Sequence, residues 1–361
     1  MGLTLTNHIT PDLQTPDLRV IVPNLNWRYS GVTATNRMIV PLLAKRLNVA
    51  WLGFYAPDNV ARMTWRDLFA LLIRRPRNPV IWHARRNNEM MAGLLLKALG
   101  WPLKPIFTSA GQRHHTWITR FLISRMDAVI AASEAAASYL KRPATVILHG
   151  IDTARYAPPA DRETAFRATG LPGRYAIGCF GRVRHQKGTD VFVDAMCRLL
   201  PKYPDFTAVI VGAVTPDQSA FNDRLKKQVE AAGLSARVRF LGELPIVEVP
   251  PWYQRILIYA FTSRNEGFGL TLLEAMSSGA ALVAARAGAA DKVVADGETG
   301  FLVPAGDATA MADALEILMR NPARAVEMGW KGRERVLSQF SIEAEADKIA
   351  GVYRDVLKAA S

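Results

Sequence analysis

Residues 256–276 read ILIYAFTSRNEGFGLTLLEAM. The stretch starts with an apolar, β-branched run that is typical of a buried strand, passes through a loop with two glycines and continues with helical composition. A strand that leads through a glycine loop into a helix is the repeating unit of parallel α/β proteins. Because the first N–H groups of a helix have no partner within it, we expect an anion to bind beside residues 267–270.

Similar strand and helix patterns recur on both sides of this stretch. The other short apolar runs are 18–25, 48–54, 79–84, 104–109, 127–133 and 144–150 in the first half of the chain, and 174–181, 206–212, 237–243, 280–285 and 300–305 in the second. Short buried strands that alternate with helices predict a parallel sheet covered by helices on both faces. The predicted fold class is therefore α/β, with two Rossmann-like domains.

The break between the two domains is expected near residue 150. Pro158 and Pro159 stop any regular element after the first series of strands. We predict a polar tail at residues 1–17, an N-terminal domain at 18–150 and a C-terminal domain at 151–340. Residues 341–361 carry apolar side chains at helical spacing, and this helix could pack back on the N-terminal domain.

Positive charge is concentrated in the first half of the chain. Residues 1–150 hold 19 Lys and Arg against 7 Asp and Glu, whereas the rest holds 26 against 25, for a net charge of +13. A basic half indicates an anionic partner, which could be a nucleic acid, an acidic membrane surface or an acidic substrate. A solvated basic face is the alternative.

The cysteines and the apolar runs restrict the class of protein. Cys179 and Cys197 lie in apolar contexts without metal-binding spacing, which favours a reducing cytoplasm and no structural metal. Lys97 interrupts the apolar run MMAGLLLKALGW, which falls short of the roughly 18 residues that a membrane span needs. The polar N-terminus is unlike a signal peptide.

A second loop with anion-binding character follows the run at 174–181. It reads GCFGRVRHQKG (178–188), so a strand ends in glycine and three cations come before the next helix. Arg182 offers a planar fork of donors and Lys187 a point charge, both suited to a diphosphate. An ordinary basic loop would have the same composition.

Two carboxylates flank the glycine loop quoted first. Glu266 precedes its turn, and Glu274 lies eight residues later, inside the predicted helix. Because a carboxylate in a phosphate site would repel the ligand, the pair is useful only if both accept hydrogen bonds from neutral hydroxyls. Sugar and ribose hydroxyls meet that need, whereas a helix cap and a solvated glutamate are the alternatives.

With these motifs the chain resembles the retaining glycosyltransferases of family 4. The resemblance rests on Glu266 and Glu274 with GFG between them, on EAMSSG (274–279), on GRVRHQKG (181–188) and on ADGETGFLVPAGD (295–307). It implies the GT-B fold, in which two facing Rossmann-like domains enclose a donor cleft. It covers residues 174–340 strongly and the first domain more weakly.

The resemblance also implies roles for individual residues. Arg182, Lys187 and Glu266 would be catalytic, with the two cations on the donor diphosphate and Glu266 on hydroxyls of the transferred sugar. The other donor-binding residues would be Gly31, Gly267, Phe268, Gly269, Leu270 and, at the ribose, Glu274. The implied mechanism retains anomeric configuration, and the leaving diphosphate accepts the proton of the acceptor. It needs neither a metal nor a cofactor, because cations of the protein stabilise the diphosphate.

Two sequence segments in the first half of the chain resemble bacterial lipopolysaccharide core mannosyltransferases. They are VIWHARRNNEM (80–90) and IFTSAGQRHHTWITRFLISRMDAVIAAS (106–133). This resemblance implies GDP-mannose as donor and an anionic inner-core glycolipid as acceptor. The histidine that many relatives carry after the fourth strand is absent here, where Phe107–Ala110 stands. The candidate acceptor residues are His83, Arg85, Arg113, His114 and His115.

Residues 61–75 and 114–121 combine aromatic and basic side chains. The first stretch, ARMTWRDLFALLIRR, has helical apolar spacing and could lie in a membrane interface or face the core. We expect a cytoplasmic protein on the inner leaflet, with no nucleic-acid partner because no such motif accompanies the charge.

Other functions of the same fold remain open. They are transfer from a UDP-sugar, epimerisation of a nucleotide-sugar, and a non-catalytic module that binds sugar nucleotides or glycans. A nicotinamide-dependent dehydrogenase is disfavoured, because no G-x-G-x-x-G follows the first strand.

Overall fold

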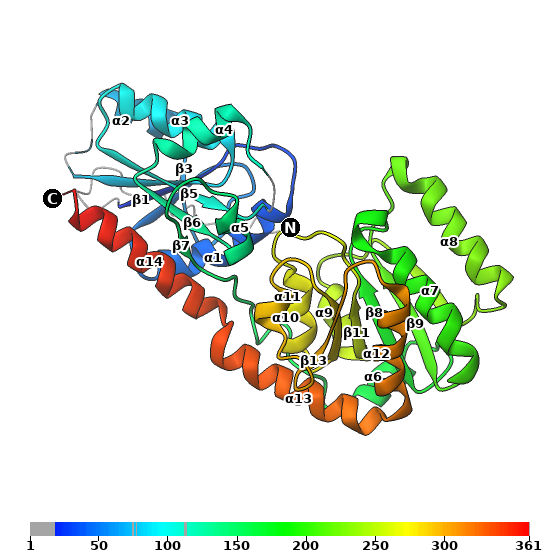
Figure 1. The fold of residues 1–361 in the computed structure, drawn as a ribbon. Helices are drawn as coiled ribbons and strands as arrows, with labels where there is room; N and C mark the ends of the chain where they lie inside the picture. Colours follow the sequence, from blue (N-terminus) through cyan, green and yellow to red (C-terminus); the bar gives the residue numbers. More distant parts are fainter. Residues whose placement is uncertain (1–18, 74–75, 77, 112–113, 361) are drawn as a thin grey trace, which may run out of the picture. The chain divides into compact units, whose positions relative to one another are not determined.

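The computed structural model describes residues 19–73, 76, 78–111 and 114–360, so the predicted tail at 1–17 lies outside the described residues. The chain divides into two compact units (Figure 1). The first contains Met1–Leu148 and Ile342–Ser361, and the second contains His149–Ser341. The division falls close to residue 150, where the prolines indicated a break.

The first unit is built on a parallel sheet with the strand order β3-β2-β1-β4-β5-β6-β7. The strands are β1 (Val20–Asn24), β2 (Val49–Gly53), β3 (Ala61–Met63), β4 (Val80–Ala84), β5 (Leu103–Ser109), β6 (Ala128–Ala131) and β7 (Thr145–Val146). From β1 the chain moves toward one edge, and from β4 it moves toward the other. Right-handed crossovers therefore send α1 to one face and α3 and α4 to the opposite face.

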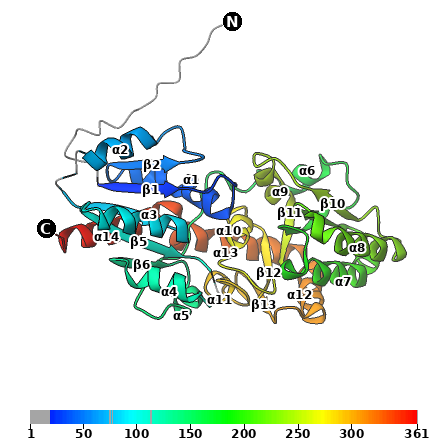
Figure 2. The same cartoon turned by 90° about the horizontal axis from the view of Figure 1, so that it is seen from above.

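Helices cover both faces of this sheet (Figures 1 and 2). They are α1 (Gly31–Ala44), α2 (Trp65–Ile73), α3 (Asn87–Ala98), α4 (Trp117–Ser124), α5 (Glu134–Ser138) and α14 (Ile342–Lys358). The last helix of the chain, α14, packs against α1 and buries Ile342, Ile349 and Tyr353 in the first unit's core. An ion pair of 2.6 Å between Arg46 and Asp347 joins α14 to the end of α1.

The second unit is a parallel sheet of its own with the order β10-β9-β8-β11-β12-β13. Its strands are β8 (Tyr175–Phe180), β9 (Phe206–Val211), β10 (Val238–Gly242), β11 (Ile256–Phe261), β12 (Ala281–Ala285) and β13 (Gly300–Val303). Its helices are α6 (Arg162–Arg167), α7 (Thr189–Leu199), α8 (Ser219–Ala231), α9 (Val249–Arg255), α10 (Leu270–Ser277), α11 (Ala290–Val293), α12 (Ala308–Arg320) and α13 (Pro322–Gln339). The predicted α/β class with two Rossmann-like domains is confirmed.

One predicted helix starts later than expected. The pattern at 61–75 indicated a single helix, but Ala61–Met63 pairs with β2 as the edge strand β3. Helix α2 begins only at Trp65, because Thr64 and Asp67 cap it reciprocally. The Thr64 N–H donates to the Asp67 carboxylate over 2.7 Å, and the Asp67 N–H donates to the Thr64 hydroxyl over 3.2 Å.

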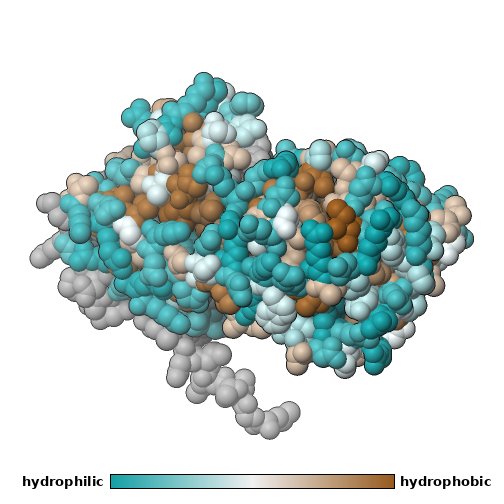
Figure 3. Space-filling view, turned by 60° about the horizontal axis from the view of Figure 1, so that its bottom comes forward, coloured by the Kyte–Doolittle hydropathy of each residue, from teal (hydrophilic) through white to brown (hydrophobic). Residues whose placement is uncertain are grey.

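The surface is mostly hydrophilic, with hydrophobic residues gathered in separate patches in the view of Figure 3. Within the described part of the chain, no helix is both long enough and apolar enough to span a bilayer.

Candidate active site

The two predicted anion-binding loops lie at the same edge of the second sheet. β8 and β11 are neighbouring parallel strands, so the loops that follow them begin side by side. The next strand after β8 lies on one side, and the next strand after β11 lies on the other. Ligands of open α/β sheets bind at the carboxyl ends of the strands at such a point of reversal. The edge beyond β8 and β11 is therefore the candidate active site.

Gly188 lies where the loop after β8 contacts the loop after β11. Its φ of +66° lies in the left-handed region, and a Cβ on it would stand 1.9 Å from the carbonyl oxygen of Thr262. The Thr262 hydroxyl donates to the Lys187 carbonyl over 2.9 Å, and the Arg264 N–H donates to the Gln186 carbonyl over 2.9 Å. These two hydrogen bonds fix the loop after β8 to the loop after β11, and the absence of a Cβ on Gly188 permits the close approach.

Lys187 and Glu266 meet in this locked position and form an ion pair. Their side chains remain 22% and 20% exposed, so both are still accessible to a ligand. The Gly267 N–H donates to Glu266 Oε1 over 3.2 Å and holds the carboxylate at the turn. An incoming diphosphate would compete with Glu266 for Lys187 and would release that carboxylate toward neutral hydroxyls.

Contacts within the second unit fix the turn from Gly267 to Leu270. The Phe268 carbonyl accepts from the Ala289 N–H over 2.8 Å, and the buried Phe268 ring packs edge-on against His149 with centroids 5.1 Å apart. Gly269, with a φ of +98°, caps the N-terminus of α10. The start of α10 therefore has a fixed backbone that directs N–H groups beyond the sheet edge.

Glu274 is held by two tyrosines that sequence reasoning missed. The hydroxyl of Tyr156 donates to Oε1 over 3.1 Å, and the hydroxyl of Tyr253 donates to Oε2 over 2.6 Å. Burial raises the pKa of the Glu274 carboxyl above its usual value. The two phenols orient a carboxylate that still has acceptor capacity for a hydroxyl.

A third cation accompanies Arg182 and Lys187. The Arg182 side chain is exposed, whereas Arg184 is partly buried and its Nε has no hydrogen-bond partner among the described residues. Burial, and then the charge of Arg182, lower the pKa of the Arg184 guanidinium. Sequence reasoning counted Arg184 in the loop but gave it no role. Its unsatisfied donor makes it a further candidate for anion binding.

Cys179 lies beneath this loop in β8. It is buried 3.6 Å from the hydroxyl of Thr262, and burial raises the pKa of its thiol to about 11. Among the described residues, no group of three or more His, Cys, Asp and Glu side chains could hold a metal ion. The thiol is therefore a small core side chain and not a nucleophile.

In the first unit, Gly31 is exposed at the start of α1, and a Cβ on it would meet no atom within 4 Å. Arg86, which the sequence did not single out, anchors the loop before Gly31. Its guanidinium donates to Asn24 over 2.7 Å, to Ser30 over 2.8 Å and to the buried Glu89 over 2.8 Å. The loop is therefore positioned by the end of β4.

His83 and Arg85 lie at the end of β4, but they differ in accessibility. The His83 ring is buried, with Nδ1 2.5 Å from the Tyr353 hydroxyl and Nε2 2.7 Å from the Thr108 hydroxyl. Burial lowers the pKa of His83 well below its usual value. His83 offers no ring atom to an acceptor and instead ties α14 to the sheet. Arg85 is partly exposed, and burial lowers the pKa of its guanidinium.

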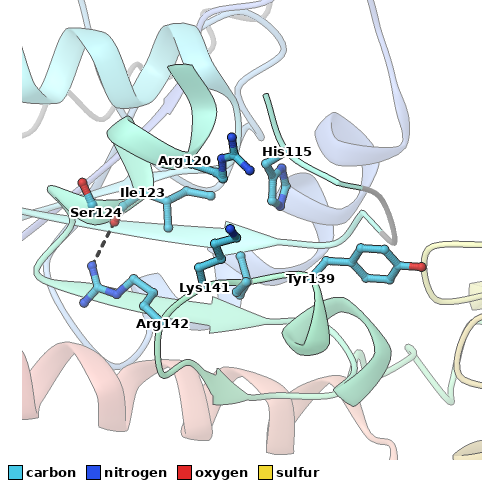
Figure 4. A pocket seen from close by; sticks show the side chains of 8 residues that line it. His115, Arg120, Ile123, Ser124, Tyr139, Lys141 and Arg142 are labelled. Carbon is cyan, nitrogen blue, oxygen red and sulfur yellow. Dashed lines mark hydrogen bonds between the residues drawn. The ribbon is translucent and has the colours of Figure 1, made fainter. Parts of the chain in front are cut away.

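His115 lines a small basic pocket (Figure 4), whereas Arg113 lies outside the described residues. The pocket has a volume of about 90 Å³, and its lining residues are His115, Arg120, Ile123, Ser124, Tyr139, Leu140, Lys141 and Arg142. His114 packs edge-on against Tyr139 with centroids 5.1 Å apart. The structure thus separates the candidate acceptor residues into the end of β4 and this pocket.

Comparison with known proteins agrees with this geometry. Residues 161–335 match the family model of glycosyl transferases group 1. Over 352 residues the chain is 48% identical to the lipopolysaccharide core biosynthesis mannosyltransferase LpcC of Rhizobium leguminosarum bv. viciae, covering 96% of this chain and 98% of that one.

Two solved structures resemble this chain, one over about half of it and one over nearly all of it. One is the C-terminal domain of a glycosyl transferase group 1 family protein (LpcC) from Francisella tularensis, which is 36% identical with a TM-score of 0.52 and covers 53% of this chain and 99% of that one. The other is Anabaena Alr3699/HepE in complex with UDP and glucose, which has a TM-score of 0.79 over 94% of this chain and 100% of that one. At 19% identity it supports the fold alone. The chain belongs to the glycosyl transferases group 1 family and is a glycosyltransferase.

Proposed function

We propose that this enzyme transfers mannose from GDP-mannose to an anionic glycolipid of the lipopolysaccharide inner core, with retention of anomeric configuration. The observation that carries the proposal is the pairing of Lys187 with Glu266 at the start of α10. It joins a cation for a diphosphate to a carboxylate for sugar hydroxyls in one fixed turn. The choice of mannose and of the core acceptor is supported by the 48% identity to a lipopolysaccharide core mannosyltransferase.

The donor would lie across the carboxyl edge of β8 and β11. Arg182 and Lys187 would bind the diphosphate, and the N–H groups at the start of α10 would add positive potential. Glu266 would then accept hydrogen bonds from the sugar. Glu274, held by Tyr156 and Tyr253, would accept them from the ribose.

In this scheme, cations of the protein that are in position before the reaction begins lower its barrier. As the bond from the sugar to the diphosphate breaks, negative charge grows on the leaving oxygen, and Lys187 and Arg182 stabilise it there. The diphosphate accepts the proton of the acceptor hydroxyl, which attacks from the same face. Protein cations would take the place of a divalent metal in this step.

The acceptor would be bound by the first unit, whose residues carry most of the net positive charge. Arg85 at the end of β4 and His115 beside the basic pocket are candidate contacts. An acidic glycolipid in the inner leaflet of the inner membrane matches that charge. The enzyme would then work on the cytoplasmic side as a peripheral protein.

The test is a donor screen with the purified protein. GDP-mannose, UDP-glucose, UDP-galactose and UDP-N-acetylglucosamine are each offered with and without a lipopolysaccharide core acceptor, and nucleotide release is followed. Release of GDP from GDP-mannose alone, and only with acceptor, is expected. Release from a UDP-sugar would replace the mannosyl donor, conversion of the sugar without acceptor would indicate an epimerase, and binding without release would indicate a non-catalytic module.

A further inference from the structure

Helices α2, α3 and α4 cover the same face of the first unit's sheet (Figures 1 and 2). Leu68 of α2, Leu96 of α3 and Leu122 of α4 pack into one core cluster beneath them, and α3 and α4 also contact each other. Helices α1 and α14 belong to the core cluster on the opposite face. The outer sides of α2, α3 and α4 therefore form one surface, which we call the three-helix face.

The three-helix face exposes large apolar side chains. Each of them is between 46% and 76% exposed, and they are Trp65, Phe69, Ile73, Met91, Leu95, Leu99, Trp117, Ile118 and Phe121. On α2 and along α3 they recur at every fourth residue, which places them in a stripe along the helix. Since the inner sides of the same helices are buried, these helices are apolar on both sides. A helix with that pattern is normally covered on both sides.

The exposed apolar area is larger than a monomeric surface usually carries. With roughly 150–250 Å² for each aromatic side chain and more than half of each exposed, the four aromatic side chains alone present on the order of 500 Å², and the five aliphatic side chains add to that area. The largest apolar patch on a typical monomer is about 300–600 Å². The three-helix face therefore has the character of a binding surface.

The charges on this face are cationic. Arg66, Arg120 and Arg125 are exposed on or beside the helices, and the Arg125 guanidinium lies 5.2 Å from the centroid of the Phe121 ring. Lys97 is also present and pairs with Asp127 over 2.8 Å. Among the described residues of the three helices, the carboxylates are Asp67 and Glu89, which are engaged in the cap of α2 and in the buried contact with Arg86.

The positive charge of the three-helix face indicates which kind of partner it binds. Two copies of this chain packed through the face would bring like charges together, which costs binding energy. An anionic lipid surface would attract the arginines and accept tryptophan and phenylalanine at headgroup depth. The long arginine side chains can keep their charge at the phosphates while their stems lie along apolar surface.

We propose that the three-helix face docks on the surface of a bilayer that contains anionic phospholipid. Met91, Leu95 and Leu99, on α3 and at its C-cap, belong to the apolar run MMAGLLLKALGW, which the sequence showed to be too short to span a bilayer. The inference rests on the proposed function in one respect, because it brings the first unit to the membrane where a glycolipid acceptor lies. Lipid binding itself requires no sugar transfer.

The experiment is flotation of the full chain with vesicles, using phosphatidylglycerol mixed with phosphatidylcholine and phosphatidylcholine alone. Leu95→Ser and Trp117→Ser remove apolar contacts from the face. Their matched controls are Leu337→Ser and Trp330→Ser on α13 of the second unit, which are 49% and 52% exposed. We expect the wild type to bind only the anionic vesicles, each face variant to bind about tenfold more weakly, and both controls to bind like the wild type.

Three results would overturn the docking face. In the first, the wild type does not float with anionic vesicles. In the second, the face variants bind vesicles as strongly as the controls. In the third, the wild type self-associates and Leu95→Ser converts it to a monomer. Turnover on a delipidated, water-soluble acceptor separates this proposal from the enzymatic one. Wild-type turnover without vesicle binding refutes the docking face alone, whereas vesicle binding without turnover of any donor refutes the proposed function alone.

Discussion

Replacing Gly188 by alanine tests whether the two loops of the donor site are locked as described. The new Cβ would lie 1.9 Å from the backbone oxygen of Thr262, at a φ of +66°. Gly233 is a matched control in the same unit, because its φ is +68° and a Cβ there would meet nothing within 4 Å. Both substitutions carry the left-handed backbone cost of about 1 kcal/mol. Only Gly188→Ala must also move a backbone segment, which adds about 2–3 kcal/mol.

Thermal unfolding measures the difference. For a unit of this size about 1 kcal/mol lowers the Tm by about 2–4 °C, so we expect a fall of about 6–16 °C for Gly188→Ala and about 2–4 °C for Gly233→Ala. Donor affinity, measured by titration with GDP, should fall at least about tenfold in Gly188→Ala, because Lys187 would move away from the edge of β8 and β11 where it would bind the diphosphate. Equal effects of the two substitutions on Tm and on affinity would refute the locked arrangement.

Three further predictions concern charge. Lys187→Ala should reduce turnover by about 100-fold or more, because the side chain acts on the leaving group. Its Tm should stay within about 2 °C of the wild type, because the side chain is partly exposed. The control is Lys226→Ala, which removes an exposed lysine, and turnover equal to that control would exclude the role of Lys187. EDTA should leave turnover unchanged, and loss of activity that Mg²⁺ restores would require a metal in the site. Because burial lowers the pKa of His83 below its ordinary value of 6.5, the unfolded chain binds the proton first as the pH falls. The contribution of His83 to the free energy of unfolding should therefore be fully present above about pH 6.5 and decline by up to about 1.4 kcal/mol per pH unit below it. In unfolding experiments from pH 7.5 to 5.5, His83→Gln should lose this part of the pH dependence. A parallel decline in both proteins would contradict the assignment.

Buried parallel strands were readable from the sequence because both of their faces are apolar, and they appear as uninterrupted runs. β3 was missed since its three residues, Ala61–Met63, are too few to show a period. The reciprocal cap of Thr64 and Asp67 was a signal that the helix starts after them. The family followed from the loop motifs and is confirmed by the comparisons. The α/β class with two Rossmann-like domains followed from the alternation of strands and helices and is confirmed by the sheets of the structure.

The side-chain partners of the site were beyond reach of the sequence. Tyr156 and Glu274 are 118 residues apart, and nothing in either neighbourhood indicates their hydrogen bond. Lys187 and Glu266 are 79 residues apart, and their contact depends on β8 and β11 being neighbours in the sheet. His83 ends a strand as a site residue often does, but its burial under Tyr353 is a tertiary property.

Analysis of the transfer product gives the most direct test of sugar transfer at the Lys187–Glu266 site. The wild-type protein is incubated with GDP-mannose and purified inner-core glycolipid, and the product is examined by mass spectrometry and by NMR of the new anomeric centre. We predict a gain of one hexose with the anomeric configuration of the donor, and no gain with Lys187→Ala. An inverted linkage, or full transfer by Lys187→Ala, would contradict the mechanism built on these two residues.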